Sequence, residues 1–131
     1  MFWRKRTFND ESLGELKFEF NSWSGKASSN KLNEILFDVA GSKEKPNVAS
    51  LGHAKFILSN ISGYVENAEK FITNQNLDGF TDKAGILIFD GFSAFLEEGS
   101  FDMQFGLSEW DDALIVVHYK NFEPSDISLG D

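Results

Sequence analysis

Few residues in this sequence have the types and spacing that chemistry at a fixed site requires. The two histidines, His53 and His118, lie far apart along the chain, and no His-x-x-x-His pair occurs. A zinc site needs several His, Cys or carboxylate ligands at suitable spacing, and the 131 residues include no cysteine. The sequence therefore predicts no metal site and no cofactor. We interpret His53 as a surface residue or a satisfied boundary residue.

Carboxylates are abundant, but none of them forms an evident catalytic pair. Asp111 and Asp112 are adjacent, so on an extended strand they would point to opposite faces. Glu97 and Glu98 flank an expected turn. Glycoside hydrolysis needs two carboxylates that face each other across a cleft, one of them with a raised pKa. The segment 78–82 lacks the ligand spacing and the terminal glutamate of a calcium loop.

The usual signatures of nucleophilic catalysis and of cofactor binding are missing. There is no Gly-x-Ser-x-Gly and no Gly-x-Gly-x-x-Gly, the patterns that expose a nucleophilic serine or cradle a dinucleotide. We therefore expect a protein that is not an enzyme. A small enzyme acting through carboxylates is the less favoured alternative, and it would show a buried acid in a deep pocket.

Trp110 is the residue that best fits a role in binding. It stands in Ser-Glu-Trp-Asp-Asp, residues 108–112, and Trp is enriched among interface hot spots, while acidic neighbours steer a basic partner. Together with nearby acids it gives the predicted partner-binding set: Trp110, Asp111, Asp112, Glu109, Glu97, Glu98 and Asp102. The alternative is that Trp110 caps one end of the core.

Charge is unevenly distributed along the chain, whose formal net charge is −9. From residue 76 onward there are twelve acidic residues and two lysines, Lys83 and Lys120. This half would repel a phosphate backbone, so we expect no nucleic-acid partner. It suits a basic protein partner, although a solvated acidic face that keeps the protein soluble is the other interpretation.

The composition predicts a single soluble domain, residues 1–131. The absence of cysteine excludes a disulfide framework. The basic residues 1–6 are not followed by an apolar region of signal-peptide length, and no apolar run approaches the length of a membrane span. We therefore expect a cytoplasmic protein without membrane contact.

The longest regular pattern predicts one helix over 48–74. Apolar residues recur there at steps of three and four, which places them on one face of a helix: Leu51, Ala54, Leu58, Ile61, Val65, Ala68 and Ile72. Asn47 is the expected N-cap, because its side chain can accept a bond from a free N–H group. Gly63 is expected to mark a kink or a close approach to a strand.

Alternating or continuous apolar residues predict strands on both sides of this helix. A three-strand meander is expected at 15–20, 23–27 and 34–40. Later strands are expected at 85–89, 92–97, 101–107 and 113–119, with an Asp90-Gly91 hairpin turn, a central strand buried on both faces at 113–119 and a short edge strand at 127–129. The expected class is α+β: an antiparallel sheet of about six strands with one long helix packed on one face.

Short motifs in this order of elements resemble a group of small bacterial domains similar to immunity proteins. The motifs are Leu-Gly-Glu-Leu at 13–16, Trp-Ser-Gly at 23–25 and Trp-Asp-Asp-x-x-Ile-Val-Val at 110–117. The resemblance implies a protein that binds and neutralises a secreted or contact-delivered toxin, and the acidic half suits a basic toxin such as a nuclease. A stand-alone interaction or regulatory domain is the alternative. The sequence does not indicate the oligomeric state.

Overall fold

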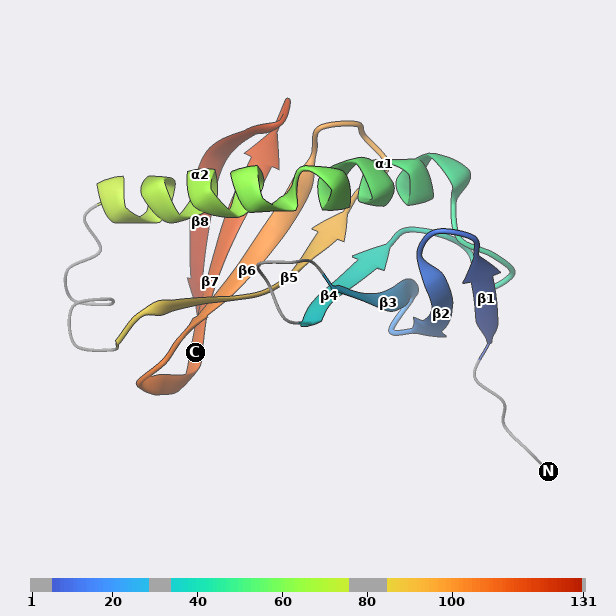
Figure 1. Cartoon of the computed structure of the whole chain (residues 1–131), viewed down its shortest axis with the longest axis horizontal. Coiled ribbons are helices and arrows are strands. Elements are labelled where there is room, and N and C mark those ends of the chain that lie inside the picture. Colours follow the sequence, from blue (N-terminus) through green and yellow to red (C-terminus); the bar gives the residue numbers. More distant parts are fainter. Residues whose placement is uncertain (1–5, 29–33, 76–84, 131) are drawn as a thin grey trace.

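The computed structural model describes residues 6–28, 34–75 and 85–130, and the segment 78–82 considered for calcium lies outside them. All described strands belong to one sheet of eight, in which they lie in chain order. Figure 1 shows them following one another from β1 at one end to β8 at the other. The strands are β1 Thr7–Asp10, β2 Gly14–Glu19, β3 Ser22–Ser28, β4 Glu34–Val39, β5 Leu87–Ala94, β6 Phe101–Leu107, β7 Trp110–Lys120 and β8 Glu123–Gly130.

The sheet consists of two four-strand meanders joined side by side. All neighbouring strands are antiparallel except β4 and β5, which are parallel. A parallel pair needs a long crossover, and here two helices, α1 Val48–Ser59 and α2 Ile61–Asn74, lie between the two strands in the chain. The predicted class, an antiparallel six-strand sheet with one helix, is therefore wrong, because the sheet is mixed, has eight strands and is accompanied by two helices.

The helical segment begins where the sequence predicts but is divided. Asn47 is the N-cap, and its side chain accepts a 3.1 Å hydrogen bond from the Ser50 N–H. The break falls at Asn60, whose backbone leaves helical geometry and whose side-chain amide donates to the Phe56 carbonyl at 3.0 Å. Gly63 was expected to mark the irregularity, but it lies within α2, and a Cβ there would meet nothing within 4 Å.

The core lies on one face of the sheet, against the two helices (Figure 1). Alternate residues of β6 and β7 are buried on this face, together with seven residues of the helices: Leu51, Ala54, Ile57, Ile61, Val65, Ala68 and Ile72. Strand β7 is buried on one face only, since Leu114 is 43% exposed. The expectation of burial on both faces was wrong. We call the other face, which carries Leu114, the open face.

One turn and one further strand differ from the sequence expectation, and the strands expected at 85–89 and 92–97 are a single strand, β5. Asp90 and Gly91 do not form a hairpin; they lie inside β5, at a shift in its register with β6. Positive φ occurs instead at the pairs 20–21 and 121–122, which connect β2 to β3 and β7 to β8. Strand β1 was missed, because its four residues, Thr-Phe-Asn-Asp, are too few and too polar for a clear alternation.

Two buried polar side chains hold α1 to the strand ends. The Ser50 hydroxyl donates to the Ala94 carbonyl at 2.9 Å and accepts from the Ala40 N–H at 3.0 Å. His53 Nδ1 lies 2.9 Å from the Phe95 carbonyl oxygen, and His53 Nε2 accepts a 3.1 Å hydrogen bond from the Gly99 N–H. Both ring nitrogens are thus engaged, so His53 is a satisfied buried residue.

Candidate functional site

A row of polar side chains crosses the whole open face. The strand registers connect one residue of each strand to the next, and every member is polar. We call these eight residues the polar row: Thr7, Lys17, Ser24, Asp38, Ser93, Asp102, His118 and Asp126. Directly paired residues on one face have Cβ atoms about 5 Å apart, so the row places donors and acceptors within reach of one another.

The middle of the polar row is joined by side-chain hydrogen bonds. The Ser93 hydroxyl donates to Asp38 Oδ2 at 3.0 Å, and Gln104, from the neighbouring row, donates through Nε2 to the Ser93 oxygen at 3.1 Å. These contacts fix Asp38 in a partly buried position on β4. Burial raises the pKa of Asp38, the Ser93 hydrogen bond opposes the rise, and the negative charge of Asp102 adds to it.

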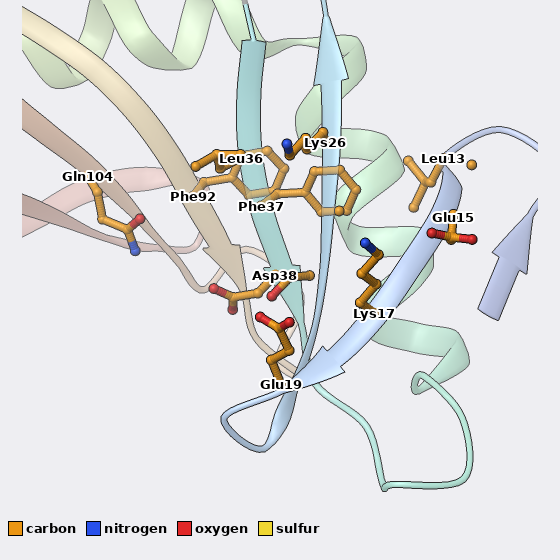
Figure 2. A pocket seen from close by; sticks show the side chains of 13 residues that line it. Leu13, Glu15, Lys17, Glu19, Lys26, Leu36, Phe37, Asp38, Phe92 and Gln104 are labelled. Atoms are coloured by element: carbon orange, nitrogen blue, oxygen red, sulfur yellow. The ribbon is translucent and has the colours of Figure 1, made fainter. Parts of the chain in front are cut away.

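A shallow hollow of about 720 Å³ lies beside this part of the row. Its lining includes charged residues of both signs and apolar side chains, chiefly Glu15, Lys17, Glu19, Lys26, Leu36 and Asp38. In Figure 2 the carboxylates of Glu19 and Asp38 lie near one another, and Leu13 and Glu15 are at the far side of the hollow from Gln104. The hollow therefore combines a partly desolvated acid with cations and an apolar wall.

The other end of the row holds a second hydrogen-bonded group. His118 Nδ1 lies 2.7 Å from Asp102 Oδ1, and His118 Nε2 lies 2.6 Å from the Ser128 hydroxyl. Sequence reasoning considered His118 only as a metal ligand and found no second ligand at suitable spacing. Alternation along a strand shows which face a side chain takes, but these partners stand on β6 and β8 and depend on the strand order.

The structure does not gather the predicted partner-binding residues into one patch. Glu97 and Glu98 lie in the β5–β6 connection, which adjoins the start of β6. Glu109, Trp110 and Asp111 follow the other end of β6. Seven extended residues span about 20 Å, so the two groups lie about that far apart. Trp110 is half-buried and packs against the core. The partner-binding role of the set stays a prediction.

Two members of that set belong to the open face. Asp102 is part of the polar row, and Asp112 precedes the buried Ala113 on β7, so alternation turns it to the open side. Asp90 also lies on the open face. Gly106 faces that side because its neighbours on β6 are buried, and Asp90 Oδ2 lies 3.3 Å from the position that a Cβ on Gly106 would take. Local desolvation raises the pKa of Asp90.

Replacement of Asp38 by asparagine is expected to stabilise the protein modestly at neutral pH. Because the pKa of Asp38 is raised in the folded state, its charge lowers stability as pH rises through that pKa. Asparagine keeps an acceptor for Ser93 and carries no charge. The free energies of unfolding of the two proteins, measured with denaturant, should therefore be equal at acidic pH. At higher pH the asparagine variant should be the more stable. An equal gap between the two proteins at every pH would contradict the argument.

The described residues contain no group of three His or acidic side chains that could hold a metal ion. In the same part of the chain, no helix has the length and apolar character needed to cross a bilayer. Comparisons of the chain with protein-family models, with curated proteins and with solved structures each found no match.

Proposed function

We propose that the protein is a cytoplasmic immunity protein that binds a basic bacterial toxin through the open face of its sheet. The observation that carries the proposal is the charge of this face. Strands β2 to β8, which form this face, contain ten acidic residues, three lysines and no arginine. Acidic surfaces steer basic proteins into encounter and exclude acidic ones.

The open face also has the apolar groups and the size that a stable contact requires. Leu36, Ile88 and Leu114 are each between 40 and 50% exposed, although they stand inside strands. With strands about 4.8 Å apart and residues about 3.3 Å apart, β2 to β8 offer roughly 30 Å by 20 Å. That area approaches the ~800 Å² per partner of a standard interface.

Affinity purification of the tagged protein from its native cell, with mass spectrometry of what co-purifies, tests the proposal. We expect one basic polypeptide that is held tightly and released by high salt, since charge pairs across the contact are screened. Its gene should neighbour the gene of this protein. Recovery with a metabolic or regulatory complex would overturn the immunity role in favour of a stand-alone interaction domain.

The hollow beside Asp38 supports a second candidate, an enzyme acting through carboxylates. Such an enzyme needs one acid with a raised pKa, and Asp38 meets that requirement beside Glu19. Substitution of either residue would abolish turnover in an enzyme. In a binding protein the same substitutions would alter only affinity for the partner, which separates the two candidates.

A further inference from the structure

Asp102, His118 and Ser128 have the geometry of an acyl-transfer relay. They stand on three neighbouring strands, β6, β7 and β8, and the two contacts measure 2.7 Å and 2.6 Å. A nucleophile within hydrogen-bond reach of a base, with the base oriented by a third group, is the arrangement by which serine becomes reactive. Such an arrangement is recognised by its geometry, whatever the fold or the order in the chain.

The carboxylate determines which ring nitrogen of His118 can act as a base. A carboxylate only accepts hydrogen bonds, so Asp102 holds the proton of neutral His118 on Nδ1. Nε2 then has its lone pair free to accept the Ser128 hydroxyl. This tautomer is the one that takes a proton from serine during nucleophilic attack. Asp102 is therefore a positioning residue, and His118 and Ser128 are the reacting groups.

Ser128 is accessible, and an apolar surface adjoins it. Ser128 is exposed on β8, an edge of the described sheet. Edge strands present backbone N–H groups without a strand partner, and on β8 the Ile127 N–H donates to Asp126 Oδ1 at 2.8 Å. Ser128 pairs with Val116, and the neighbouring Leu114 pairs with Gly130, which has no side chain to cover it. This surface suits an apolar acyl group.

We propose that Ser128 is a nucleophile that accepts an acyl group from small activated esters with an apolar acyl chain. Ser128 Oγ forms a bond to the acyl carbon while its proton passes to His118 Nε2. The ester C–O bond breaks, and the leaving alcohol takes that proton from His118. Water, deprotonated by the same nitrogen, then attacks the acyl-serine, and Ser128 recovers its proton as the carboxylic acid leaves.

The test is covalent labelling of the full-length protein with a biotinylated fluorophosphonate, followed by peptide mass spectrometry. We expect one adduct per chain, on Ser128, and none in Ser128→Ala. The matched control is Ser125→Ala, because Ser125 lies on the same strand but its hydroxyl donates to the His118 backbone carbonyl. This variant should label like the parent protein. Labelling of the parent no faster than of Ser128→Ala would overturn the proposal.

Variants of the base and of its positioning residue separate chemistry from structure. His118→Ala should slow labelling by about 10²–10⁴-fold, the usual contribution of a general base. Asp102→Asn should slow it as well and should shift the His118 ring proton from Nδ1 toward Nε2, which ¹⁵N NMR reports directly. An unchanged tautomer in Asp102→Asn would contradict the positioning role. If Ser128 is labelled as expected but no basic partner is captured, the proposed immunity function is disproved and the nucleophilic role of Ser128 is retained.

Discussion

Replacement of Gly91 by alanine is expected to lower the free energy of unfolding by about 2–3 kcal/mol, at the upper end of typical overpacking costs. Gly91 stands opposite Leu36 where β4 and β5, the parallel pair, join the two meanders. A Cβ on Gly91 would lie 2.1 Å from the Leu36 carbonyl oxygen and 2.9 Å from its carbon. These are backbone atoms, so relief requires a shift of the strand itself.

The matched control is the same substitution at Gly63 in α2. A Cβ there meets nothing within 4 Å, and alanine favours a helix over glycine by about 0.5–1 kcal/mol. Gly63→Ala should therefore raise the midpoint of denaturant unfolding, and Gly91→Ala should lower it. Equal effects of the two substitutions would contradict the close contact at the parallel joint.

Reversal of two open-face charges is expected to weaken the proposed complex by about 100-fold, equivalent to about 2.7 kcal/mol. Asp112→Lys and Asp126→Lys suit this purpose because both side chains are exposed, so the fold should tolerate them. Both lie on the open face, Asp126 by its pairing with His118. Titration calorimetry with the purified partner at low and high salt measures the loss.

Two further variants locate the contact. Glu66→Lys with Glu69→Lys changes two acids of α2, on the helical side of the molecule, and should leave affinity unchanged. Glu97→Lys with Glu98→Lys changes the β5–β6 connection. A loss of affinity confined to that loop variant would place the contact at the loop end of the acidic half and away from the open face.

The sequence predicted individual elements better than their assembly. Strands β2, β3, β4 and β6 alternate apolar and polar residues, so their positions could be found from the pattern alone. The end of α1 could not, because the break depends on bonds that Asn60 makes to the preceding turn. Asp90-Gly91 resembles a hairpin turn in sequence. In the structure, Gly91 is needed because the Leu36 backbone lies too close for a side chain at that position.

The candidate site was largely beyond prediction from the sequence. Asp102 and Asp112 were chosen for their charge, and both lie on the open face. His118 was considered only as a metal ligand, and nothing in the sequence connected it with Asp102 or Ser128. Only the order of strands and their registers, which arise from packing across the whole sheet, bring these three residues together.

Carboxylate footprinting of the complex tests the binding surface most directly. A carbodiimide with an amine labels exposed carboxylates, and mass spectrometry compares each site in the free and the bound protein. We predict that Asp112 and Asp126 lose reactivity when the basic partner binds, while Glu66 and Glu69 on α2 keep theirs. Protection of Glu66 and Glu69 with continued labelling of Asp112 and Asp126 would show that the partner binds elsewhere and would contradict the proposal.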